Sequence, residues 1–188
     1  MRSFLLACIL VPLLGVSAWA GTFSLDLNDH STQFGYAQKL NTQSYGDSVA
    51  RVRYLYNDDT DTHLIGVAGG VKGSPGTVDG LKLGIELALN GAETKDDQEI
   101  LALGLGFNGE YMPPALRGLG LDAHLIYAPD IFAFIDCEDY LEWGVGASYQ
   151  VLPNAKVTLA YQQIDVDLEG GGSKDLDETV RIGVKFEF

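Results

Sequence analysis

Apolar and polar residues alternate with a period of two along most of the chain. In residues 180–188 the even positions are Val180, Ile182, Val184, Phe186 and Phe188, and the odd positions carry Arg, Gly, Lys and Glu. Residues 141–151 repeat the pattern with an apolar residue at every odd position. Because successive side chains of a β-strand point to opposite faces, both segments are predicted to be strands with one apolar face.

Eight further segments show the same alternation, which brings the expected number of strands to ten. No segment has a helical 3,4 repeat of convincing length, so the predicted fold class is all-β. No linker is long enough to separate two domains. The alternative is a barrel of eight strands, which would result if the short first pair of segments or the Gly-rich fourth segment did not form strands. The additional segments are residues 23–27, 34–40, 50–56, 65–71, 81–89, 101–107, 119–127 and 157–161.

The first twenty residues follow a different pattern. Arg2 gives a positive start, residues 4–16 are apolar, and small residues at 18 and 20 precede Gly21. These are the three parts of a secretory signal peptide. A membrane-spanning helix needs about 20 apolar residues, more than this stretch provides. We therefore expect a cleaved signal peptide at residues 1–20 and one domain at residues 21–188.

Alternation alone leaves open whether the apolar face points into a soluble core or outward into lipid. Two levels of aromatic residues near strand ends are typical of membrane barrels, and only a closed barrel pairs every backbone group of strands that cross a bilayer. We therefore predict a transmembrane antiparallel β-barrel of the bacterial outer membrane. One aromatic level contains Tyr54, Tyr56, Tyr127 and Trp143, and the other contains Phe23, Phe107, Tyr149 and Phe188.

Charge restricts the partners. The chain has 12 Lys+Arg against 26 Asp+Glu and a net charge of −14, which argues against nucleic acid. The acidic residues concentrate in connections that the parity of ten strands places outside the cell: residues 57–61, 90–98, 129–139 and 167–177. Expected partners are outer-membrane lipid and lipopolysaccharide. The barrel assembly machinery is expected to recognise Phe188, because a terminal Phe that closes an alternating strand resembles its assembly signal.

The polar face of the strands supplies a candidate lumen lining. Because unpaired buried charge is costly, we expect opposite charges to pair there and fill a narrow interior. The alternative is a thin polar channel. The candidate lining residues are Lys39, Arg51, Arg53, Lys82, Glu86, Asp122, His124, Glu142, Arg181 and Lys185.

Candidate catalytic and metal chemistry is sparse. Asp122 and His124 share one strand face, a geometry that could support general-base chemistry, but the second acidic pair of outer-membrane proteases is not evident. Residues 57–61 lack the Gly and distal Glu of an EF-hand, so only weak, nonspecific metal binding is expected there. Cys137 is the one cysteine after the signal peptide, so no internal disulfide can form. We expect no enzyme activity, no catalytic site, no cofactor and no metal site.

Residues 131–135 are unusual for a connection between strands. Burial would stabilise the protein by roughly 1.5–3 kcal/mol for each of Ile131, Phe132, Phe134 and Ile135. We therefore expect the segment to pack against other apolar groups and not to remain in water. It could fold over the barrel mouth as a lid, or lean against the acyl chains of the outer leaflet. A local hydrophobic cluster with no gating role is the third alternative.

The chain contains four short motifs, Asn57-Asp58-Asp59, Tyr127-Ala128-Pro129-Asp130, Tyr140-Leu141-Glu142 and Gly183-Val184-Lys185-Phe186-Glu187-Phe188. With these motifs it resembles the YfaZ family of outer-membrane proteins, and the resemblance covers essentially all of residues 21–188. The resemblance implies a porin-like protein without assigned catalytic residues, and the chain departs from the family pattern at residues 131–135. The expected function is a narrow or closed porin-like channel with a charge-paired lumen and acidic extracellular loops. The alternative is a structural or interaction barrel that contacts lipopolysaccharide, divalent cations or other cells without transport.

Overall fold

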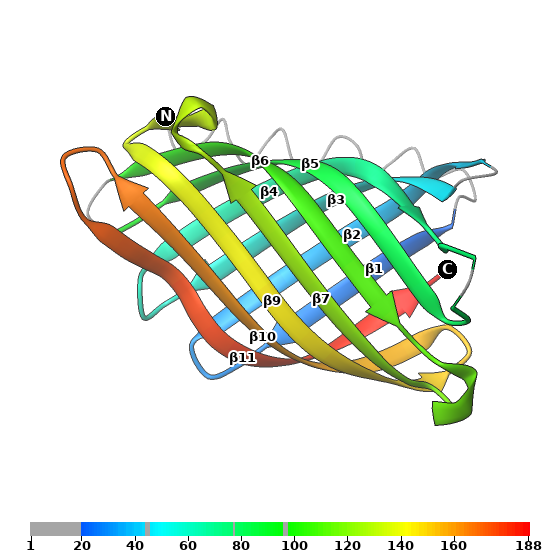
Figure 1. Cartoon of the computed structure of the whole chain (residues 1–188). Helices are drawn as coiled ribbons and strands as arrows, with labels where there is room; N and C mark the ends of the chain where they lie inside the picture. The colour runs from blue at the N-terminus through cyan, green and yellow to red at the C-terminus, as the bar shows by residue number, and fades with distance from the viewer. Residues whose placement is uncertain (1–19, 44–45, 77, 96–97) are drawn as a thin grey trace.

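The computed structural model describes residues 20–43, 46–76, 78–95 and 98–188, and the predicted signal peptide lies outside this part except for Ala20. Ten long antiparallel strands form a closed barrel, in which the first strand pairs with the last (Figure 1). The predicted all-β, ten-stranded barrel is confirmed. The strands are β1 (Gly21–Leu27), β2 (Ser31–Gln43), β3 (Gly46–Asn57), β4 (Thr62–Gly73), β5 (Leu81–Glu93), β6 (Glu99–Tyr111), β7 (Leu119–Ala128), β9 (Cys137–Leu152), β10 (Ala155–Leu168) and β11 (Ser173–Glu187).

Three short elements complete the described structure. A 3-10 helix, η2 (Pro114–Leu116), connects β6 to β7, and a second, η3 (Asp130–Phe132), leads into the short strand β8 (Ala133–Ile135). The two 3-10 helices lie at opposite ends of the barrel (Figure 1). Within the described residues, no helix has the length and apolar character needed to span a membrane.

The predicted apolar face points outward. On β5, Leu83, Ile85, Leu87 and Leu89 expose between 45% and 59% of their surface, whereas the residues between them face the interior. A soluble monomer rarely leaves so large an apolar surface in water, while the hydrocarbon of a bilayer covers it. The outward face is therefore the lipid-facing wall of a transmembrane barrel.

An aromatic pair marks where this apolar wall ends. The rings of Trp143 on β9 and Tyr161 on β10 contact each other at a centroid distance of 5.2 Å. The next outward positions on β10 are polar, Gln163 and Asp165. Asp165 lies four residues beyond Tyr161, roughly 13 Å along the strand, and so outside the membrane-spanning part. We call this side, where β3 joins β4 and β10 joins β11, the acidic end.

The interior is divided into an apolar layer toward the acidic end and a polar region farther from that end. Only polar residues were expected on the inward face, so the apolar layer differs from the expectation. The physical reason is that a ten-stranded barrel is narrow and its interior must be filled to close packing. The largest members of the apolar layer are Leu55, Leu64, Ile100, Ile126, Tyr140, Ile164, Val166 and Leu176, each at most 3% exposed.

The connections at the acidic end are shorter than predicted because the strands continue into them. Residues 90–93 belong to β5, residues 137–139 to β9 and residues 173–177 to β11. Residues 133–135, expected in a connection, form β8 and pair with residues 100–102 of β6. Because β7 pairs with β6 only from Leu105 onward, β8 supplies partners to backbone groups of β6 that β7 does not reach.

Candidate functional site in the barrel interior

A buried ion pair spans the barrel directly beside the apolar layer. Arg53 on β3 and Glu142 on β9 are 6% and 0% exposed, and their strands lie five positions apart around the barrel in either direction. Both guanidinium nitrogens Nη1 and Nη2 donate to the Glu142 carboxylate. This bidentate, charge-assisted arrangement is the strongest and most directional way to pair an Arg with a carboxylate. The pair therefore joins opposite walls of the lumen.

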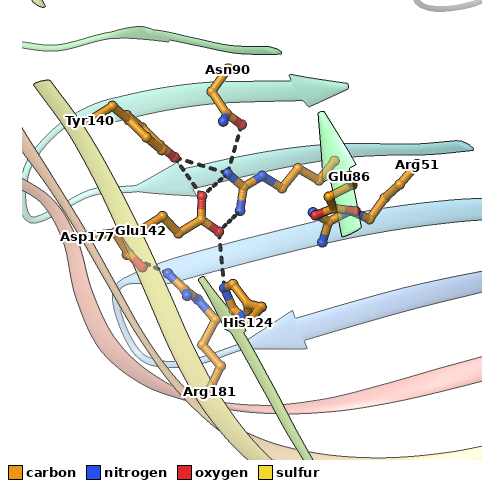
Figure 2. Close-up of polar contacts among 9 residues, drawn as sticks. Arg51, Glu86, Asn90, His124, Tyr140, Glu142, Asp177 and Arg181 are labelled. Carbon is orange, nitrogen blue, oxygen red and sulfur yellow. Dashed lines mark hydrogen bonds and ion pairs between the residues drawn. The ribbon is translucent and has the colours of Figure 1, made fainter. Parts of the chain in front are cut away.

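Two neutral side chains complete this cluster. Arg53 Nη2 also donates to Asn90 Oδ1 at 2.9 Å and to the Tyr140 hydroxyl at 3.2 Å, and that hydroxyl donates to Glu142 at 2.6 Å. Figure 2 shows Tyr140 and His124 in contact with Glu142, whereas Asn90 lies farther from it. The cluster thus links β3, β5, β7 and β9 and leaves neither buried charge without partners.

A glycine on the strand between β3 and β5 makes room for this cluster. Gly66 lies opposite Arg53 on one side and opposite Asn90 on the other. A Cβ atom at Gly66 would lie 2.6 Å from Asn90 Oδ1 and 2.8 Å from Arg53 Nε, closer than van der Waals contact allows. The absence of a side chain at this position therefore permits the Arg53–Asn90 contact.

His124 belongs to the same cluster. Its Nε2 lies 3.2 Å from Glu142 Oε1, whereas the nearest cation to Asp122 Oδ1 is Lys185 Nζ at 4.0 Å. The structure therefore directs the two groups considered as an acid–base pair toward different partners.

A second buried ion pair lies on β11, two strands away from Glu142. Arg181 donates to Asp177 Oδ1 at 2.5 Å and to Ser31 Oγ at 2.8 Å, and Asn57 donates to the same Asp177 oxygen at 2.8 Å. Arg181 and Asp177 are 3% and 0% exposed. Figure 2 shows this pair close to Glu142.

The remaining predicted lining residues lie farther from the apolar layer. Arg51 Nη2 is 2.6 Å from Glu86 Oε1, and Lys39 Nζ is 2.9 Å from Asp47 Oδ2. Lys82 is exposed near the start of β5.

Sequence reasoning missed several members of these clusters. Tyr140 and Asn90 share the inward parity of Glu142 and Glu86, so the alternation itself could have identified them. Asp177 has the same odd parity as Arg181, but it was missed because residues 167–177 were expected to form a connection; the register irregularity of β11 lies beyond it, between the partners of Ile164 and Asp165.

Cys137, at the acidic end of β9, is not a reactive thiol. It is 2% exposed, and burial together with the nearby carboxylates of Asp139 and Asp167 raises its pKa to about 11. Because the thiolate is the nucleophile and the metal ligand, a protonated Cys137 supplies neither function at neutral pH.

The closed barrel, the lipid-facing apolar wall and the polar interior define a transmembrane β-barrel of the outer-membrane class. Within that class the chain belongs to the YfaZ family, whose model, described as YfaZ precursor, matches residues 1–188. The resemblance inferred from the short motifs is therefore confirmed. No curated protein matches the chain.

Solved structures with a similar arrangement include three outer-membrane channels and porins. The outer membrane channel DcaP of Acinetobacter baumannii has a TM-score of 0.47 and 14% identity, over 90% of this chain and 62% of that one. The present chain thus spans less than two thirds of the length of DcaP. The KdgM porin has a TM-score of 0.43 and 10% identity, over 90% and 99% of the two chains. The NanC porin has a TM-score of 0.42 and 8% identity, over 91% and 100%.

Proposed function

We propose that the protein is a porin-like barrel of the bacterial outer membrane whose channel is narrow or closed and whose lumen charges are paired. The observation that carries this proposal is the Arg53–Glu142 pair, which spans the lumen next to the apolar layer. Export by the signal peptide at residues 1–20, insertion by the barrel assembly machinery, and acidic loops that face outside the cell are parts of the same proposal.

The apolar layer gives the physical reason for low conductance. An ion passes a channel only where water or polar groups replace its hydration shell, and a hydrophobic constriction acts as a gate because it excludes water. Leu55, Leu64 and Tyr140 are each 0% exposed and lie in one buried cluster. An ion that entered from either end would therefore meet an apolar barrier.

Single-channel conductance in planar bilayers tests this proposal. The wild-type protein should show little or brief conductance, and the double variant Leu64→Ala/Tyr140→Ala should conduct several-fold more because it removes two members of the apolar layer. The matched control is Ile65→Ala/Leu141→Ala, which changes the adjacent, lipid-facing residues. Steady wild-type conductance of an open pore would contradict the closed interior.

A structural or interaction barrel is the second candidate function. It would contact lipopolysaccharide, divalent cations or other cells through its acidic end, where Asp58, Asp59 and Asp61 are exposed. The apolar layer favours this candidate too, since such a protein needs no open lumen. If neither the wild type nor the Leu64→Ala/Tyr140→Ala variant conducts, the second candidate is preferred. Neither candidate function requires catalysis.

A further inference from the structure

We propose that His30, Asp58 and Asp59 form a zinc-binding site at the acidic end of the barrel. His30 lies in the connection between β1 and β2, and the two aspartates lie in the connection between β3 and β4. From the sequence no metal site was expected, because residues 57–61 lack the Gly and distal Glu of an EF-hand and indicate only weak, nonspecific metal binding. The site is separate from the lumen cluster and does not depend on whether the barrel conducts.

The distances between the donor atoms match those of a zinc centre. His30 Nδ1 lies 3.3 Å from Asp58 Oδ1 and 3.4 Å from Asp59 Oδ1, and all three donor atoms lie within 4.8 Å of one another. Zinc binds histidine nitrogen and carboxylate oxygen at about 2.0–2.1 Å in a tetrahedron, which places two ligand atoms about 3.3–3.4 Å apart. The imidazole nitrogen is therefore already at the required separation from each of the two carboxylates.

Hydrogen bonding does not account for this arrangement. A charge-assisted N–H···O bond has a length of about 2.7–2.9 Å, shorter than both contacts of the imidazole. In the described part of the chain, the His30 ring donates no hydrogen bond to Asp58 or Asp59; the bond that His30 donates runs from its backbone N–H to Asn28. A neutral imidazole could in any case satisfy only one carboxylate through Nδ1. A dication at the centre would satisfy both carboxylates at once.

The two connections are held in place independently of any metal. The backbone N–H of Asp58 donates to the His30 carbonyl at 2.8 Å, which joins the connections directly. Asn28 Oδ1 accepts the His30 N–H at 2.9 Å, and the buried Asn57 accepts the Asp59 N–H at 3.0 Å. A site whose ligands are already positioned loses less ordering entropy on binding.

The donor set favours zinc over the alkaline-earth ions. Ca²⁺ and Mg²⁺ prefer oxygen ligands only, whereas an imidazole nitrogen with carboxylates suits Zn²⁺. The side chains of His30, Asp58 and Asp59 are 57%, 51% and 65% exposed, so zinc can enter from solvent and water can occupy the remaining position.

Calorimetric titration of Zn²⁺ into the folded, detergent-solubilised protein tests the proposal. We expect one zinc per chain, with affinity lowered roughly tenfold or more in His30→Ala, Asp58→Asn and Asp59→Asn, since even loss of an outer-shell contact costs 10–100-fold. The matched controls Asp29→Asn and Asp61→Asn change the same charge in the same two connections and should bind as the wild type does. Equal weakening by the controls, or unchanged binding in His30→Ala, would overturn the site.

Cobalt gives a second readout that diffuse acidic charge would not produce. Co²⁺ in place of zinc should show the strong visible absorption of a tetrahedral centre, and His30→Ala should abolish it while Asp29→Asn keeps it. Excess Ca²⁺ should not displace the bound cobalt. A weak, octahedral-type spectrum that does not change in His30→Ala would contradict the proposal. Heat-modifiable gel migration shows for each variant that the barrel is folded.

Discussion

Arg53 and Glu142, 89 positions apart in the chain, form a bidentate ion pair across the diameter of the barrel. Each charge is buried and depends on the other for compensation. A buried pair is weak evidence for stability in itself, but removal of one partner is strongly destabilising because the remaining charge is left uncompensated.

Replacement of Glu142 should therefore have a large effect on stability. Glu142→Gln should lower the free energy of unfolding by about 3–5 kcal/mol, and the double variant Arg53→Met/Glu142→Leu should recover most of this loss. Urea unfolding in detergent, followed by the gel migration of the folded form, measures both. Lys39→Gln is the control: Lys39 is 54% exposed, and loss of its pair with Asp47 should cost about 0–1 kcal/mol. Similar losses for Glu142→Gln and Lys39→Gln would contradict the buried pair.

Two glycines of β4 provide a matched test of the packing around Arg53. Gly66→Ala should destabilise the barrel by about 1–3 kcal/mol, because the new methyl group overlaps Asn90 and Arg53. Gly69→Ala places the same group where no atom lies within 4 Å, so it should be neutral or slightly stabilising. Thermal unfolding of the two variants gives the comparison, and equal stabilities would show that Arg53 is not confined by Gly66.

Substitutions in residues 131–135 distinguish a lid from a part of the wall. Phe134 pairs with Leu101, a lipid-facing residue of β6, and both Phe132 and Phe134 are 44% exposed. We therefore expect Phe132→Ser/Phe134→Ser to lower stability by about 1 kcal/mol per residue, less than for full burial, and to leave conductance unchanged. Increased conductance with unchanged stability would instead support a lid over the mouth.

The pH dependence of stability should reveal the raised pKa of the Asp165 carboxyl group. Burial, followed by the neighbouring Asp175 carboxylate, raises the pKa of Asp165 to about 6, above the ordinary value of 3.8. The folded state therefore holds a proton that the unfolded state has lost between about pH 4 and 6, so stability falls as pH rises through this window. Asp165→Asn should remove this loss: it should be more stable than the wild type above pH 6, and the advantage should disappear below pH 4.

The exposed Asp167 on the same strand supplies the control for this pH profile. Asp167→Asn removes the same charge two residues away, so a general reduction of negative charge would affect both variants alike. An advantage of Asp165→Asn that is independent of pH, or that is shared by Asp167→Asn, would argue against a proton held at Asp165.

Deletion of Phe188 should lower the amount of folded barrel in the outer membrane. The Phe188 backbone exchanges hydrogen bonds of 2.8 and 2.9 Å with Gly21, and its ring stacks on Tyr36 at a centroid distance of 6.4 Å. Phe188 therefore contributes to the seam where the first and last strands close the barrel, in addition to its predicted role in assembly. Heat-modifiable protein in membrane fractions measures the effect. Phe188→Tyr, which keeps an aromatic ring, should insert normally. Normal insertion of the deletion variant would contradict the predicted role of Phe188 in assembly.

Much of the fold follows from local patterns. The lipid-facing residues of β5 and β11 were identified correctly from alternation alone, because a period of two requires only that a strand has two different faces. The number of long strands followed in the same way. The alternation did not reveal the apolar layer, because Leu55 stands between the aromatic residues Tyr54 and Tyr56, and Leu64 precedes the apolar Ile65, so the inward phase is hidden there.

The partners of the interior charges were decided only by the tertiary structure. Arg53 and Glu142 were both assigned to the lumen from sequence, but their pairing depends on the diameter at which ten strands close. His124 contacts Glu142 rather than Asp122 because β7 pairs with β9 in a register that sets His124 opposite Gly144, two residues from Glu142. His30 and Asp58 meet because β2 pairs with β3 and sets Ser31 opposite Asn57, which brings the two connections side by side. Alternation is a property of neighbours in the chain, whereas these contacts join residues that only the pairing of the strands and the closure of the barrel bring together.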